Sequence, residues 1–218
     1  MTPCAAVEIK PIGYFRSPLA EKFGIPRQAG LVPELCGWIE LEKEYSAPEA
    51  LRGLEGFDYL WIIWGFDTEG WSPTVRPPRL GGNERVGVFA SRSPFRPNPL
   101  GLSSVRIGAI EEGRIRVYGA DLRDGTAVYD IKPYVEYADS HSGIRSGFVD
   151  STLWKPLEVR LPDSLRSEFD ESELTALRGI LEQDPRPGYH DDPSRIYGLT
   201  FAGRNIRFKV QDNILTVL

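Results

Sequence analysis

Short apolar runs separated by glycine and proline dominate the first two thirds of the chain. Runs of this length with β-branched and aromatic side chains predict strands. The strands expected on this basis are 7–15, 37–41, 59–66, 85–90, 102–110 and 114–120. The run at 59–66 (YLWIIWGF) is continuously apolar, which predicts a strand buried on both faces. Residues 48–55 predict a short helix, with Pro48 in its first turn and Gly56 just after its end.

Many short strands with few helices favour a sheet closed on itself. The expected fold class is therefore mainly β, with a small β-barrel N-terminal domain at 1–145. Residues 140–151 (SHSGIRSGFVDS) are polar and rich in glycine and serine, as in a linker. A small α+β C-terminal domain is expected at 146–218.

The C-terminal part carries the clearest helix signal in the chain. Asp170 and Glu173 form an acidic capping box, and an apolar face continues to about Gln183. The apolar residues of that face are Leu174, Leu177, Ile180 and Leu181. Beyond it, the runs 197–201, 206–210 and 214–218 predict an antiparallel meander that turns at 202–205 and 212–213.

Composition narrows the class of protein. Of 218 residues, 41% are hydrophobic and 26% charged, which is typical of a soluble globular chain. We expect a cytoplasmic protein without membrane contact, because no secretory leader or bilayer-length apolar run is present. Cys4 and Cys36 lack zinc-site spacing, and His141 and His190 are the two histidines, so no metal is expected.

Common catalytic motifs are also missing. The sequence has no P-loop, no GxGxxG after a strand, no HExxH and no GxSxG. With only two histidines, a Ser-His-Asp triad is hard to assemble. These absences favour chemistry in which a reactive cofactor supplies the electrophile and the protein positions it.

Charge is unevenly distributed. The net charge is −5, but residues 70–106 hold six arginines and one acid, Glu84, for a local charge of +5. The arginines are Arg76, Arg79, Arg85, Arg92, Arg96 and Arg106. An anionic partner is expected to dock on this segment. The alternative is that these arginines pair with scattered acids in a loop-rich fold.

Three segments combine backbone control with polar side chains. Residues 26–31 (PRQAGL) could wrap a small ligand with exposed amides, or form an ordinary turn. Residues 76–101 place proline beside most of the arginines, so their guanidinium groups are held on stiff backbone, ready for carboxylates or phosphates. Residues 121–134 (DLRDGTAVYDIKPY) follow a strand with an Asp-Gly turn, and their carboxylates could accept hydrogen bonds from ribose hydroxyls or an α-amino group.

Together these segments resemble the TrmO family, also called TsaA, of tRNA adenosine N6-methyltransferases. The matching motifs span most of the chain and include 13–18 (GYFRSP), 21–23, 26–28, 52–55, 60–62, 73–83, 87–101, 121–134 and 183–187 (QDPRP). The resemblance implies a β-barrel enzyme that binds S-adenosylmethionine, a homodimer with the cofactor close to the subunit interface, and tRNA as substrate. It further implies methylation at N6 of N6-threonylcarbamoyladenosine next to the anticodon, at position 37.

The resemblance also assigns site residues. Cofactor contacts are expected at Arg27, Gln28, Ala29, Gly30, Phe66, Asp67, Arg92, Leu102, Asp121, Leu122, Arg123, Asp124, Gly125 and Thr126. As a hypothesis separate from the resemblance, Asp130 or Tyr129 is expected to orient or deprotonate the nucleophile, with Lys132 and Arg96 holding the threonyl carboxylate or nearby phosphates. Substrate contacts are expected at Arg76, Arg79, Arg96 and Asn98.

Two rival functions stay open on the sequence. A non-catalytic RNA-binding module would use the arginine band to grip a stem and would show no affinity for S-adenosylmethionine. A methyltransferase with a non-tRNA acceptor would keep the cofactor and change only the nucleophile.

Overall fold

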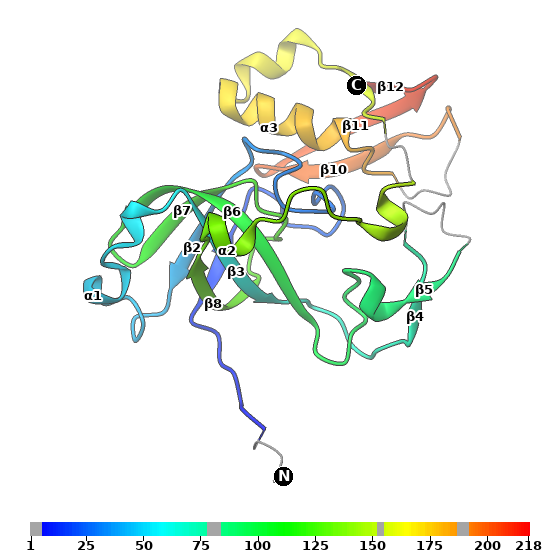
Figure 1. The fold of residues 1–218 in the computed structure, drawn as a ribbon. Coiled ribbons are helices and arrows are strands. Elements are labelled where there is room, and N and C mark those ends of the chain that lie inside the picture. The colour runs from blue at the N-terminus through cyan, green and yellow to red at the C-terminus, as the bar shows by residue number, and fades with distance from the viewer. Residues whose placement is uncertain (1–5, 78–83, 152–154, 187–191) are drawn as a thin grey trace.

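Six antiparallel strands close into a barrel in a computed structural model that describes residues 6–77, 84–151, 155–186 and 192–218 (Figure 1). Their order around the barrel is β1-β2-β7-β6-β3-β8. The strands are β1 (Gly13–Arg16), β2 (Cys36–Leu41), β3 (Tyr59–Gly65), β6 (Leu100–Glu111), β7 (Arg114–Tyr118) and β8 (Ala127–Pro133). Pairing of Gly13 with Val128 closes the sheet. The predicted mainly β fold with a barrel is confirmed.

The barrel interior is filled from alternate positions of each strand. Buried side chains there include Phe15, Ile39, Leu60, Ile62, Trp64, Val105, Ile115, Val117 and Val128. On β3, Leu60, Ile62 and Trp64 are buried, whereas Trp61 and Ile63 are partly exposed. The expectation that this strand is buried on both faces is therefore wrong. A closed sheet has one interior, and apolar outward side chains here remain on the surface.

Several predicted boundaries differ from the structure. The strand expected at 7–15 begins only at Gly13. The strand expected at 85–90 is shorter in the structure, where it forms β5 (Val86–Gly87) and pairs with β4 (Thr74–Val75). A 3₁₀ helix, η3 (Val88–Ala90), follows β5. The helix expected at 48–55 splits into α1 (Pro48–Leu51) and a 3₁₀ helix, η1 (Leu54–Gly56). Gly53 between them has φ of 90°, a left-handed conformation that ends the helix. A single turn, α2 (Glu136–Asp139), and a 3₁₀ helix, η4 (Gly147–Val149), follow β8.

The C-terminal unit is a four-stranded sheet with one helix packed on it (Figure 1). It contains β9 (Glu158–Arg160), the 3₁₀ helix η5 (Asp163–Ser167), α3 (Glu171–Glu182), β10 (Tyr197–Phe201), β11 (Arg204–Gln211) and β12 (Ile214–Val217). The capping box is confirmed, since the Glu173 amide donates to Asp170 Oδ1 at 2.8 Å and the Asp170 amide donates to Glu173 Oε2 at 3.0 Å. The meander is confirmed as well, but β9, which pairs parallel with β12, was not predicted from its three residues.

The segment between β1 and β2 belongs to the C-terminal core. Leu19, Val32 and Leu35 from this segment are buried with Leu177 and Phe208 of the C-terminal unit. The Ala202 amide also donates to the Pro18 carbonyl at 2.9 Å. The loop that carries residues 26–31 is thus held between the barrel and the C-terminal unit. The division into domains at 145/146 stays a prediction.

Candidate active site

Three long connections meet at one end of the barrel. In an antiparallel barrel, successive connections alternate between the two ends. The links β1 to β2, β3 to β6 and β7 to β8 therefore leave the same end, and they carry 17–35, 66–99 and 119–126. These connections contain most of the cofactor and substrate contacts predicted from the sequence.

Specific contacts tie the three connections together. Arg92 Nη1 donates to Gln28 Oε1 at 2.5 Å, across 64 residues of sequence. The Gly30 amide donates to the Gly119 carbonyl at 2.8 Å, and the Ala29 backbone contributes a hydrogen bond to Asp121. Gly30 has φ of 81° and would meet no atom within 4 Å at an added Cβ, so its outer side is open. Arg27 is exposed beside it.

Asp121 is the most unusual carboxylate of this end. Ser103 Oγ donates to Asp121 Oδ1 at 2.5 Å, and Trp64 Nε1 donates to Ser103 Oγ at 2.9 Å. Burial raises the pKa of Asp121, and the Ser103 hydrogen bond, with a smaller contribution from Arg92, offsets part of the rise. A carboxylate in this state gains stability from an added cation.

Ser103 and Trp64 were not predicted from the sequence. Ser103 is 2% exposed and lies at an inward position of β6, between the inward Gly101 and Val105. A hydroxyl at such a position requires a partner, because an unpaired buried polar group is costly. The sequence signal for Ser103 is a polar residue at a position where the strand points its side chains inward. It can be recognised only once it is known which positions of β6 face the interior.

The raised pKa of Asp121 predicts a pH-dependent stability of the free protein. A carboxyl group whose folded pKa exceeds its unfolded value stabilises the fold below the unfolded pKa and loses that contribution as pH rises through the folded pKa. We therefore expect Asp121→Asn to melt at a higher temperature than wild type at pH 7, with the gap closing toward pH 4. Thermal unfolding across this range measures it, and an equal gap at both pH values would contradict the burial argument.

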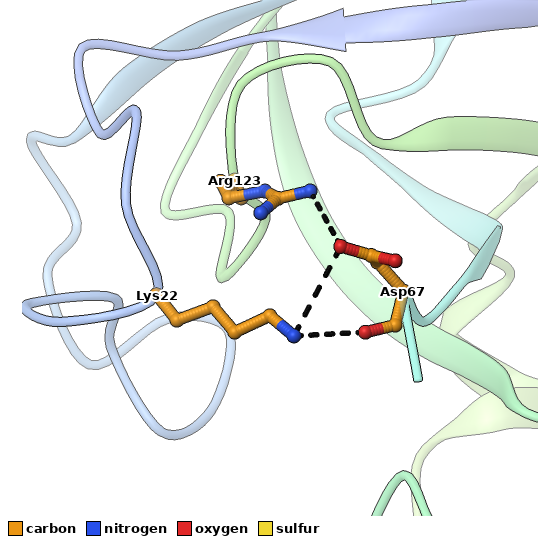
Figure 2. A network of polar contacts seen from close by, with 3 residues as sticks. All are labelled: Lys22, Asp67 and Arg123. Carbon is orange, nitrogen blue, oxygen red and sulfur yellow. Dashed lines mark hydrogen bonds and ion pairs between the residues drawn. The ribbon is translucent and has the colours of Figure 1, made fainter. Parts of the chain in front are cut away.

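Asp67 lies in a second polar cluster of the same end. Arg123 Nη2 donates to Asp67 Oδ2 at 3.1 Å, and Lys22 Nζ donates to the Asp67 carbonyl oxygen at 2.8 Å (Figure 2). The Asp67 side chain is 74% exposed, so this cluster opens to solvent. The backbone amide of the neighbouring Phe66 donates to the Pro99 carbonyl at 2.8 Å. The centres of the Phe66 and Trp64 rings lie 4.2 Å apart. Lys22 was not among the predicted site residues.

The turn at 124–126 is fixed to β1. The Ser17 amide donates to Asp124 Oδ1 at 3.0 Å, and the Gly125 amide donates to the Phe15 carbonyl at 2.8 Å. The Phe15 amide in turn donates to the Thr126 carbonyl at 2.8 Å. The Asp124 carboxylate therefore already accepts a hydrogen bond from the Ser17 backbone amide. The Leu122 side chain is buried in the barrel core, so only the backbone of Leu122 can face a ligand.

Leu102 and the residues predicted to be catalytic point to the outer face of the barrel. Ile63 on β3 pairs with Leu102 on β6 and with Asp130 on β8. Leu102 and Asp130 therefore lie on either side of Ile63, about 10 Å from each other. Asp130 Oδ2 lies 2.8 Å from Lys132 Nζ. A bulge at Tyr129 resets the alternation of β8, and the Tyr129 ring lies close to Gly65. Ser103, the partner of Asp121, points instead to the interior.

The predicted substrate residues lie around the β3 to β6 connection. Arg96 Nη1 donates to the carbonyls of Val88 at 3.1 Å and Ser91 at 2.7 Å, which orders this loop. Arg76 and Asn98 are exposed. Arg79 lies outside the described residues.

The donor set fits a zwitterionic nucleoside ligand. Arg92 and Arg27 suit a carboxylate, Asp121 suits an ammonium group, and Phe66 offers a ring to an aromatic base. Within the described segments, no three His, Cys, Asp or Glu side chains gather in a way that could hold a metal ion. None of the helices in those segments has the length and apolarity to cross a bilayer.

The fold and site define a closed β-barrel protein with a small α+β unit attached and a cluster of polar side chains at one end of the barrel. The model of the tRNA-methyltransferase O N-terminal domain matches residues 14–140, and that of the TrmO C-terminal domain matches 155–218. The chain belongs to the TrmO family, as its motifs predicted.

Relatives match along nearly the whole chain. The tRNA (adenine(37)-N6)-methyltransferase of Escherichia coli is 38% identical, with 95% of each chain covered. A putative S-adenosylmethionine-dependent methyltransferase, RcsF, of Pseudomonas aeruginosa is 41% identical, covering 88% of this chain and 87% of its own. The crystal structure of TrmO from P. aeruginosa superposes with a TM-score of 0.81 at 32% identity and covers 98% of each chain.

Proposed function

We propose that this protein is a cytoplasmic, S-adenosylmethionine-dependent tRNA methyltransferase that acts at N6 of adenosine 37. The similarity along 95% of both chains to the E. coli enzyme, whose name states this reaction, carries the proposal. The meeting of Arg92, Gln28 and Asp121 at one end of the barrel supports it, since these groups suit the charged end of the cofactor. Within this proposal the acceptor nucleoside is N6-threonylcarbamoyladenosine.

The residues divide into three tasks. S-adenosylmethionine supplies an electrophilic methyl group, so the protein must place the nucleophile in line and remove one proton. Arg92 and Asp121 would hold the carboxylate and ammonium of the cofactor, with Phe66 beside its base. Asp130 or Tyr129 would orient or deprotonate N6. Lys132 and Arg96 would hold the threonyl carboxylate or nearby phosphates, and the exposed Arg76 and Asn98, with Arg79, would contact the RNA.

Methyl transfer from labelled S-adenosylmethionine to tRNA tests the function directly. We expect label in tRNA bearing N6-threonylcarbamoyladenosine and none when residue 37 is guanosine. Nucleoside analysis of bulk tRNA from cells with and without the gene extends this to the cell. A pure RNA-binding module would give no heat on titration with S-adenosylmethionine, and a different acceptor would leave the tRNA unlabelled while cofactor still binds.

Exposed apolar side chains support a homodimer. Phe89 and Phe95 of the β3 to β6 connection are 75% and 46% exposed, and Leu100 and Leu102 at the start of β6 are 36% and 55% exposed. Large apolar side chains exposed near a candidate site are typical of a protein–protein interface. Leu102 and Asp130 also point away from the interior side that holds Asp121 and Ser103. We propose that the outer face of one subunit completes the site of the other.

Mixing two impaired variants tests this shared site, at a cofactor concentration that saturates wild-type sites but leaves Asp121→Asn sites largely empty. If Asp121 and Asp130 serve one site from different subunits, a mixed dimer of Asp121→Asn and Asp130→Asn has one intact site. Random exchange should then restore about a quarter of wild-type activity, because half of the dimers are mixed. Each variant alone, carried through the same exchange, is the control. A mixture that stays inactive while exchange is complete would place both residues in one subunit's site.

A further inference from the structure

A second cluster of arginines and aromatic rings covers the outer face of β1, β2, β7 and β6. Trp38 on β2 pairs with Arg16 on β1 and with Arg116 on β7. The guanidinium carbons of Arg114 and Arg116 lie 4.4 and 4.6 Å from the centre of the Trp38 ring. Next to them, the guanidinium carbon of Arg106 lies 4.3 Å from the Tyr118 ring centre. We call these six residues the Trp38 face.

A glycine on β6 makes room for two side chains of the Trp38 face. A register shift between Ile107 and Ile110 places Gly108 beneath its edge. A Cβ at Gly108 would lie 2.6 Å from the Tyr118 ring and 3.2 Å from the Arg116 stem. The glycine therefore allows both side chains to lie across β6, where the ring and the guanidinium planes remain on the surface.

The Trp38 face is positively charged on an acidic protein. Four arginines stand against Glu40 and Glu111, a net charge of +2 where the whole chain carries −5. The arginine side chains in these ion pairs are 39% to 50% exposed. Within the described residues, Arg106 forms no ion pair with a carboxylate. A basic, aromatic surface is complementary to RNA, which presents phosphates and unstacked bases.

The Trp38 face is continuous with the candidate active site. Trp38 is two residues, about 7 Å, from the end of β2 at which the site connections meet. Arg106 and Leu102 both point outward on β6, four residues or about 13 Å apart. A cavity of about 280 Å³ is lined by Trp38, Arg16 and Glu34 and, from the C-terminal unit, by Glu173, Ala176 and Phe201. An unpaired base next to the methylated residue could enter such a hollow.

We propose that the Trp38 face is a second tRNA-binding surface, separate from the predicted substrate residues Arg76, Arg79, Arg96 and Asn98. It holds the anticodon arm while residue 37 is in the site. Its guanidinium groups contact phosphates, and the hollow beside Trp38 takes an unpaired base. This rests on the proposed function, since it assumes that tRNA is the substrate.

The double variant Arg106→Gln, Arg116→Gln tests the proposal without touching predicted site residues. Binding of unmodified tRNA to the full-length protein is measured over a salt series. Loss of two phosphate contacts should weaken binding roughly tenfold and reduce the slope of log affinity against log salt by between about 1 and 2. KM for tRNA should rise by about the same factor, with kcat at saturating tRNA and the affinity for S-adenosylmethionine unchanged.

Arg166→Gln is the matched control, because Arg166 is an exposed arginine of η5 that pairs with Asp163, and its removal should change nothing. Trp38→Leu should weaken tRNA binding with little change in the salt slope, since it removes one wall of the hollow and the ring beneath Arg114 and Arg116 but no charge.

Wild-type affinity and slope in the double variant would overturn the Trp38 face proposal alone, provided that the wild-type protein methylates tRNA. Wild-type protein that neither binds nor methylates tRNA would overturn the proposed function and this proposal with it. Dissociation of a dimer by the double variant would assign the Trp38 face to a second copy of the chain and overturn its role in RNA binding.

Discussion

Asp121→Asn should weaken the binding of S-adenosylmethionine by about a hundredfold. Asparagine keeps the size of the side chain and still accepts the hydrogen bond from Ser103, but it loses the charge. A charge-assisted hydrogen bond to a cation contributes roughly 1.5–3 kcal/mol, and its loss from a partly buried site corresponds to this range of affinity. Isothermal titration calorimetry with the purified protein measures it.

The same variant should be more stable than wild type when free, because it removes a carboxylate that burial disfavours. Functional sites commonly lower the stability of a protein that has no ligand bound. Asp163→Asn, a change at an exposed residue of η5, is the control for both measurements. Wild-type cofactor affinity in Asp121→Asn would show that Asp121 does not hold the ammonium group.

Asp130→Asn should lower kcat by about a hundredfold while leaving cofactor affinity unchanged. A positioned base contributes about 10²- to 10⁴-fold to a rate, and asparagine cannot take the proton. The Asp130 carboxylate is 44% exposed and lies 2.8 Å from the Lys132 ammonium, so the asparagine variant also removes an ion pair. Single-turnover methylation of tRNA with saturating cofactor isolates the chemical step.

Tyr129→Phe separates the two candidates for this step. Its ring lies against Gly65 and should keep that packing after loss of the hydroxyl. If Asp130 is the base, Tyr129→Phe should stay within a few-fold of wild type. Full activity in Asp130→Asn would remove Asp130 from the mechanism, and a slow Tyr129→Phe would then assign the step to Tyr129.

Much of the fold follows from local pattern. Alternation and glycine or proline punctuation located five of the six barrel strands, and the Asp170 and Glu173 pair marked the start of α3. The sixth barrel strand, β8, was not among the predicted strands, and the strand predicted at 85–90 lies outside the barrel. Boundaries failed where local signals are weak. At the N-terminus, residues 7–12 have strand-like composition, but β1 starts at Gly13. Ile12 still extends the pairing, since its amide donates to the Val128 carbonyl and its carbonyl accepts from the Glu42 amide, both at 2.8 Å. Three residues are too few to show a pattern, so β9 was missed.

The sequence predicted the loops of the candidate site better than the contacts between its side chains. Glycine, proline and arginine in 26–31, 76–101 and 121–134 identified the segments, and the family resemblance assigned the cofactor contacts within them. The buried series Trp64, Ser103, Asp121 depends on which β6 positions face inward. The outward direction of Asp130 depends on the bulge at Tyr129, and Arg16, Trp38 and Arg116 meet through pairing across strands that are far apart in sequence.

By itself the sequence determined the barrel class, the C-terminal helix with its meander, the locally basic segment and the family. These rest on residue type and short-range spacing, which are read directly along the chain. Only the tertiary structure decided which side chains meet, because closing the sheet fixes register and brings alternate connections to one end. Burial beside Ser103 raises the pKa of Asp121, and that environment exists only after the barrel has closed.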